Sequence, residues 1–211
     1  MGQRQQLFVV TKDRENKRFD IGFHNQWCYG KTSIQQFRNI IEFNVNADKY
    51  SKLSNNDNLL SENEKLNIVK SLWGVNAKKG YYHNLISLND ELKDWSDALR
   101  LDCQDNNDGI CIIDFTSDKK PLICYVFPFD NTIYDDKDKV RKVIKAWQPI
   151  NLSEYLDCYY SKDEIETTLA GDDKDDIKFF KQVLADIKYI ERHTKYMTQE
   201  HLFKLYPYLN E

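Results

Sequence analysis

Three polar side chains, His24, Gln26 and Cys28, fall on one parity of a short stretch in which Phe19, Ile21, Phe23, Trp27 and Tyr29 fall on the other. Alternate residues of a β-strand point to opposite faces, so these three side chains would share one face. A Cys–His nucleophilic pair needs a hydrogen bond of roughly 3 Å. His24 and Cys28 would lie about 13 Å apart along a regular strand, so only a bulge could bring them together. The stretch therefore predicts a binding face and no catalytic constellation.

A second strand is expected just upstream, because Leu7–Val10 is a continuous run of β-forming apolar residues that predicts a strand covered on both faces. If the two strands pair antiparallel, Arg4 and Gln6 join the face of His24 and Gln26. That face would suit an anionic or amide-bearing ligand, with Arg4 as anion clamp, His24 as general acid or base and Gln26 as orienting group. More often, such a face has a structural role, and its polar side chains are hydrogen-bonded beneath a loop or helix.

Trp27, which is a ligand-binding candidate together with Arg4, His24 and Gln26, closes this strand with Gly30, and a helix is expected to begin directly afterwards. The free backbone N–H groups of a helix N-terminus attract anions, so Lys31–Ser33 form a weak candidate phosphate site. No glycine-rich loop precedes them. A capped helix with an aromatic plug is therefore the preferred interpretation.

The opening residues Gly2-Gln3-Arg4 and the later His24-Asn25-Gln26-Trp27 resemble a loose group of uncharacterised proteins of phages and some fungi. Those proteins open with Met-Gly-Asn/Gln-Arg and carry a His-x-x-Trp type of motif on the second strand. The resemblance covers about the first half of the chain and brings no activity with it. It implies that Arg4, His24 and Trp27 are a shared feature and that the chain has a viral or mobile-element origin.

Composition narrows the class of protein. The chain has 211 residues, a formal net charge of −4 and a pI near 5.7, which makes general nucleic-acid binding less expected than protein binding. Five cysteines without C-x-x-C spacing predict a reducing compartment and no disulfide framework. The sequence has no apolar run long enough to predict a membrane span or a secretory signal. We expect a cytoplasmic protein, in the host cytoplasm if viral, without a metal site or cofactor.

The remaining pattern predicts an α+β fold: an antiparallel sheet of about four or five strands with helices packed on one side, followed by a helical C-terminal part. We expect an α+β domain over residues 1–130 and a helical part over residues 131–211, or one continuous domain. The expected elements are helices over 32–43, 61–74 and 87–99, a loop over 75–84, a β-hairpin of 99–103 with 110–113, a strand over 122–127, and helices over 137–147, 152–160, from 161, 172–192 and 198–205.

These observations favour a non-enzymatic interaction protein, such as a phage-type accessory protein or host-defence inhibitor that binds a macromolecular partner. The alternative is a small enzyme or ligand sensor with a pocket over Arg4, His24 and Gln26 for an anionic or nucleotide-like molecule. RNA or DNA binding through Lys12–Arg18 and Lys78-Lys79 ranks below both because the chain is acidic.

Overall fold

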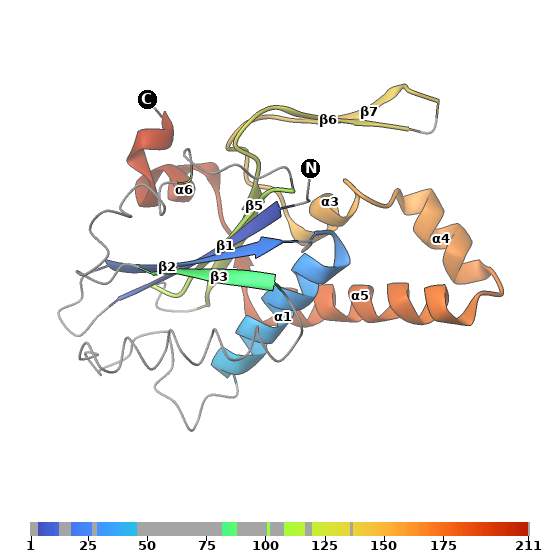
Figure 1. Ribbon diagram of the computed structural model, residues 1–211, viewed down its shortest axis with the longest axis horizontal. Coiled ribbons are helices and arrows are strands. Elements are labelled where there is room, and N and C mark those ends of the chain that lie inside the picture. The colour runs from blue at the N-terminus through green and yellow to red at the C-terminus, as the bar shows by residue number, and fades with distance from the viewer. Residues whose placement is uncertain are drawn as a thin grey trace.

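The fold is given by a computed structural model, which describes residues 4–12, 18–26, 29–45, 82–87, 101, 108–116, 120–135 and 137–210 (Figure 1). The elements follow in chain order: β1 (Arg4–Lys12), β2 (Arg18–Gln26), α1 (Lys31–Val45), β3 (Tyr82–Ser87), β4 (Ile110–Asp114), β5 (Leu122–Val126), β6 (Asn131–Tyr134), β7 (Val140–Ile144), α3 (Leu152–Leu156), α4 (Lys162–Ala170), α5 (Lys174–His193), β8 (Lys195–Tyr196), α6 (Gln199–Leu205) and the 3-10 helix η3 (Pro207–Asn210).

Six strands form one mixed sheet in the order β3-β2-β1-β4-β5-β8, and β6 and β7 form a separate two-stranded sheet. The predicted mixture of helices and strands is confirmed. The expectation of a purely antiparallel sheet is wrong, because β1 pairs with β4 and β5 pairs with β8 in parallel. Parallel neighbours need a long crossover, and β1 and β4 are separated by β2, α1 and β3 in the chain. Local sequence pattern does not show such distant pairing.

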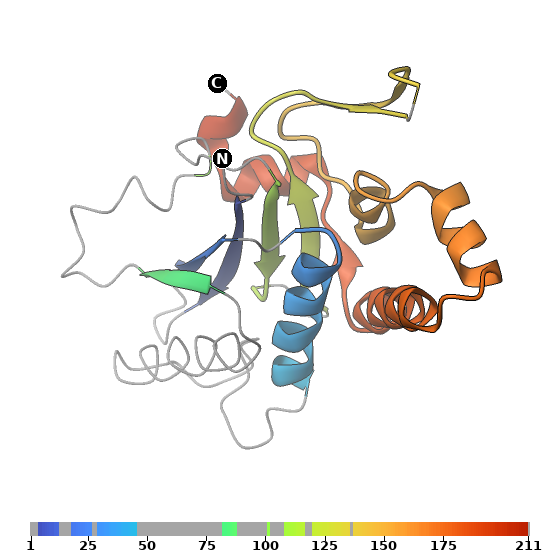
Figure 2. The same ribbon diagram turned by 45° about the vertical axis from the view of Figure 1, so that its right-hand side comes forward.

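The sheet is covered on both faces, not on one. Leu7 and Val9 of β1 belong to a core cluster with residues of α1 and α5, whereas Phe8 and Val10 belong to a second cluster with residues of α6. All four side chains are fully buried, so the predicted two-sided burial of this strand is confirmed. Figure 2 shows α1 and α5 on one side of the sheet and α6 on the other. An uninterrupted apolar strand requires cover on both faces.

The predicted helix over residues 137–147 is wrong, since this segment contributes β7 and the turn of a β6–β7 hairpin. Val140, Val143 and Ile144 fit helical spacing, but β-branched side chains also favour strands. Asp138 has a φ of +55°, a left-handed conformation that a helix interior does not allow. The carboxylate of Asp135 accepts hydrogen bonds from the N–H groups at 137 and 139 and so builds the turn.

Two further local predictions fail. The hairpin expected between 99–103 and β4 is not formed at β4, because β1 and β5 occupy both of its edges. Leu101 lies in a 3-10 turn, and the rest of 99–103 lies outside the described residues. Gly109 does have the positive φ that its turn predicted, +87°. Residues Tyr82–Ser87 form strand β3 where a loop and a helix start were expected. The helix predicted over 61–74, and most of the one over 87–99, lie outside the described residues.

The C-terminal helices follow their capping signals. Ser161 and Glu164 form the predicted capping box of α4, and the side chain of Asp173 caps α5. Thr198 caps α6. These caps fix where the helices begin, and the apolar stripe of α5 then packs into the core beside α1. The predicted helix over 152–160 is shorter, because α3 ends at Leu156.

Candidate interaction surface

The β6–β7 hairpin projects away from the six-stranded sheet in both views (Figures 1 and 2). Four of the six large hydrophobic side chains that are exposed in the described part of the chain lie on this hairpin or directly before it. Their exposed fractions are 50% for Phe129, 55% for Tyr134, 58% for Val140 and 47% for Val143. An apolar group of this kind on an otherwise charged protein marks a candidate interaction site.

The two faces of the hairpin differ because of its register. Thr132 lies opposite Val143, and after a register shift Tyr134 lies opposite Val140. The shift leaves Arg141 as an extra residue in β7, a β-bulge that places Val140 on the same face as Val143. We call Thr132, Tyr134, Val140 and Val143 the outer face.

The inner face of the hairpin is part of the core. Ile133 and Ile144 are buried and belong to the cluster that contains the α1 and α5 side of the sheet. A hairpin with one buried face normally presents polar side chains to water on the other. Here the outer face is mainly apolar although its side chains are exposed. Packing against the described part of this chain therefore does not explain why these residues are apolar.

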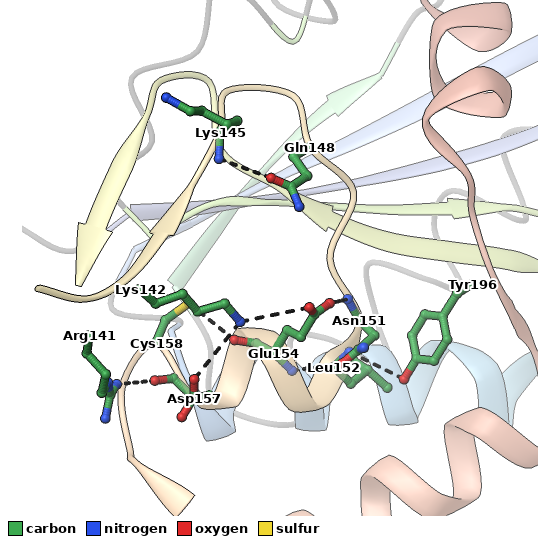
Figure 3. Close-up of polar contacts among 10 residues, drawn as sticks. All are labelled: Arg141, Lys142, Lys145, Gln148, Asn151, Leu152, Glu154, Asp157, Cys158 and Tyr196. Carbon is green, nitrogen blue, oxygen red and sulfur yellow. Dashed lines mark hydrogen bonds and ion pairs between the residues drawn. The ribbon is translucent and has the colours of Figure 1, made fainter. Parts of the chain in front are cut away.

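Basic side chains of β7 hold the hairpin onto α3 (Figure 3). Lys142 Nζ lies 3.9 Å from Glu154 Oε1 and 4.0 Å from Asp157 Oδ2. The Arg141 guanidinium donates a hydrogen bond to the carbonyl of Asp157. Glu154 also completes the capping box of α3 with Asn151, accepting the Asn151 N–H at 2.9 Å. The inner face is therefore tied to a helix start whose geometry is already fixed.

The base of the hairpin is closed by a second set of contacts. Asp130 accepts hydrogen bonds from Lys145 Nζ at 2.7 Å and from the Ala146 N–H at 2.9 Å. The hydrogen bond from Lys145, followed by that from Ala146, lowers the pKa of the Asp130 carboxyl. The Lys145 N–H also donates to Gln148 Oε1 at 3.3 Å (Figure 3). These contacts fix the direction in which the hairpin leaves the body.

Helix α3 is in turn anchored to the main sheet. The Tyr196 hydroxyl of β8 accepts the Leu152 N–H at 3.3 Å and donates to Glu191 at 2.8 Å. The Cys158 thiol donates to the Glu154 carbonyl at 3.3 Å, and burial raises its pKa to about 12. The outer face of the hairpin therefore rests on a continuous chain of packed and hydrogen-bonded groups.

Of the residues that sequence analysis selected first, the structure describes the backbone of four: Arg4, Gln6, His24 and Gln26. Arg4 lies opposite Gln26, and Gln6 lies opposite His24, in the antiparallel β1–β2 ladder. The register thus places the four residues on one sheet face, the one that Phe8 shares with α6. Trp27 and Cys28 lie outside the described residues. A binding role for Arg4, His24, Gln26 and Trp27 stays a prediction.

Tyrosines fill the helix N-terminus that was a weak candidate for phosphate. The Gly30 N–H donates to the Tyr155 hydroxyl at 3.3 Å, and a Cβ added at Gly30 would lie 3.4 Å from the ring of Tyr159. Ser33 Oγ lies 2.7 Å from the Tyr125 hydroxyl, whose ring stacks on Tyr155 with centroids 3.6 Å apart. Aromatic packing at this helix start agrees with the expected aromatic plug, whereas the cap of the helix stays a prediction.

One polar pair that joins a buried residue to a partly exposed one was not found from the sequence. His201 Nε2 of α6 lies 2.7 Å from Asp114 Oδ2 at the end of β4, and Asp114 is fully buried. The other oxygen of Asp114 accepts the Thr116 N–H at 2.7 Å. The two residues are far apart in the chain, and no spacing rule connects them.

Comparisons with protein families, with curated proteins and with solved structures find no match to this chain. Among the described residues, no helix is both long and apolar enough to cross a membrane. The same part of the chain contains no cluster of three or more His, Cys, Asp or Glu side chains placed to hold a metal ion.

Proposed function

We propose that this chain is a non-enzymatic interaction protein that binds a protein partner through the outer face of the β6–β7 hairpin. The supporting observation is the exposure of Tyr134, Val140 and Val143 on a hairpin whose other face is buried. Interfaces draw much of their binding energy from a few apolar and aromatic side chains that become fully desolvated. A hairpin fixed in the free protein loses little conformational entropy on binding.

The edges of the hairpin offer a second mode of contact to the same partner. In the described part of the chain, β6 and β7 pair only with each other. Each strand therefore has one edge whose backbone N–H and C=O groups are not used in a ladder. An extended segment of a partner can add to such an edge while its side chains pack on the outer face.

Charge argues against nucleic acid as the partner of this hairpin. Residues 130–145 contain five basic and four acidic side chains, interspersed along the segment. A phosphate backbone is bound by a surplus of cations, and the outer face itself is apolar. A phage-type accessory or host-defence role remains the biological setting that we propose from the N-terminal resemblance.

The alternative function, an enzyme or ligand sensor, is supported by the register that aligns Arg4, Gln6, His24 and Gln26 on one face. A His24→Gln variant separates the two proposals. It would abolish binding of a co-purifying small molecule if the alternative holds, whereas capture of a protein partner through the hairpin would be unchanged.

The proposed function is tested by affinity capture from a lysate of the source cells, treated with nuclease. The bait is the wild-type chain or a triple outer-face variant, Tyr134→Ser with Val140→Thr and Val143→Thr. Val45→Thr, which changes an exposed valine at the end of α1, serves as the matched control. We expect a protein retained by the wild type and by Val45→Thr and lost with the triple variant. Equal retention by all three baits would contradict the proposal.

A further inference from the structure

A second surface lies where α4 approaches α5, and it has a different character from the hairpin. A groove of about 720 Å³ opens there. Its lining includes Tyr160, Asp163, Thr167, Asp176, Phe179 and Phe180. Figures 1 and 2 show α4 on the same side of the molecule as the hairpin.

Three aromatic rings form the apolar part of this groove. Tyr160 contacts Phe179 and Phe180 edge-on, with ring centroids 6.0 and 5.1 Å apart, and the two phenylalanines meet at 4.7 Å. Phe180 is buried, while Tyr160 and Phe179 are half-buried. Such a fixed group of rings provides apolar surface for the stem of a long side chain.

Acidic side chains surround the rings. Asp163, Glu164 and Asp176 line the groove and are exposed. The whole segment 161–176 has seven acidic and two basic residues, a net charge of −5. Glu164 already accepts the Ser161 N–H in the capping box of α4, so Asp163 and Asp176 are the stronger candidates for charge pairing. Asp173 caps α5, while Asp163 and Asp176 lie in the first turns of α4 and α5, where they also complement the helix dipoles. Both line the same groove.

The chain itself shows how a cation uses these rings. Lys31 Nζ of α1 lies 3.4 Å from the centroid of Phe179, a cation–π contact. Lys31 lines the smaller hollow between α1 and α5, and it also interacts electrostatically with Asp176. The larger groove presents the same combination of aromatic surface and carboxylates without a lysine or arginine among its lining residues.

We propose that the α4–α5 groove binds a basic segment of a protein partner, with a lysine or arginine stem against Tyr160 and Phe179 and its charged end between Asp163 and Asp176. The charge complementarity selects a cationic peptide over an anionic or neutral one. This proposal goes beyond the hairpin and does not depend on it, because different residues carry it.

The test uses the full chain and a short labelled peptide of alternating Arg and Gly, with an alternating Gln and Gly peptide as the neutral probe. Fluorescence anisotropy at physiological salt gives the affinity. The groove variant combines Asp163→Asn and Asp176→Asn. The control combines Glu166→Gln and Asp172→Asn, which removes the same charge from residues outside the groove lining. Circular dichroism checks that each variant is folded.

We expect the groove variant to weaken binding of the Arg peptide about tenfold and the control to weaken it less than about twofold. Thr167→Trp, which fills the groove without a change of charge, should also weaken binding. The outer-face hairpin variant should bind the peptide as the wild type does. Equal weakening by both charge variants, no weakening by the groove variant, or equal binding of the neutral probe would overturn the proposal.

Discussion

Tyr134 lies directly opposite Val140 across the β6–β7 ladder, and more than half of each side chain is exposed. Their pairing depends on the bulge at Arg141, without which Val140 would face the same way as Ile144. Cross-strand pairs of aromatic and β-branched residues stabilise a hairpin. An exposed pair of this kind also gives a partner an apolar surface of fixed geometry, and that combination motivates the proposed function.

The two faces of the hairpin should respond differently to substitution. Val143→Thr, on the outer face, should change the free energy of unfolding by no more than about 0.5 kcal/mol. Ile144→Ala removes a fully buried side chain and should cost about 2–4 kcal/mol. Urea unfolding of both variants measures this difference. Equal losses would show that the face assignment is wrong.

The contact between β7 and α3 should be a modest one. Glu154→Ala removes both the partner of Lys142 and the return bond of the capping box, and should cost about 1 kcal/mol. Glu154→Gln keeps a hydrogen-bond acceptor for the Asn151 N–H and loses only the partly exposed ion pair, so it should cost less than about 0.5 kcal/mol. Thermal or urea unfolding distinguishes them. A larger loss for Gln than for Ala would reverse the assigned roles.

The buried Asp114 should be important for attaching α6 to the sheet. Asp114→Ala leaves the Thr116 N–H and His201 without their acceptor and should cost about 2–4 kcal/mol. Asp138→Asn, in the exposed hairpin turn, is the control and should have little effect, because asparagine tolerates the positive φ of this position. The free energy of unfolding at neutral pH measures both, and a loss no greater than that of the control would exclude the pair as a stabilising contact.

The free energy of unfolding should fall as the pH rises through the ordinary pKa values of cysteine and tyrosine. Burial raises the pKa of Cys158 to about 12 and that of Tyr155 well above its usual value. In the unfolded chain these groups ionise near about 8.5 and 10. The unfolded state therefore loses protons that the folded state keeps, which favours unfolding as pH increases.

Cys158→Ser isolates one part of this effect. A serine hydroxyl can donate to the Glu154 carbonyl as the thiol does, but it does not ionise in this range. Denaturant unfolding at pH ~7 and pH ~10 should show a smaller loss of stability for Cys158→Ser than for the wild type. An identical loss in both proteins would show that Cys158 does not contribute.

Sequence reasoning succeeded where the deciding interactions are local. Ser161 with Glu164 predicted the start of α4, and the unbroken apolar run Leu7–Val10 predicted a strand covered on both faces. It failed where the same residues fit both the period of a helix and that of a strand. Val140, Val143 and Ile144 satisfy helical spacing, and a bulge lets them satisfy a hairpin as well.

Long-range contacts could not be predicted from the sequence, for a different reason. The parallel pairing of β1 with β4 and the contact of His201 with Asp114 join segments that are distant in the chain. Of the predicted site residues, Arg4, His24 and Gln26 are placed by register on one face, while the exposed hairpin surface lies in a segment that periodicity assigned to a helix.

The most direct test of the central claim is the affinity of the captured partner. The purified partner is titrated by calorimetry against the wild-type chain and against the triple outer-face variant. If the outer face is the binding surface, losing its apolar side chains should weaken the affinity by about thirtyfold or more, the effect typical of interface hot spots. The Val45→Thr control should bind as the wild type does. An affinity for the triple variant within about twofold of the wild-type value would contradict the hairpin as the site of binding.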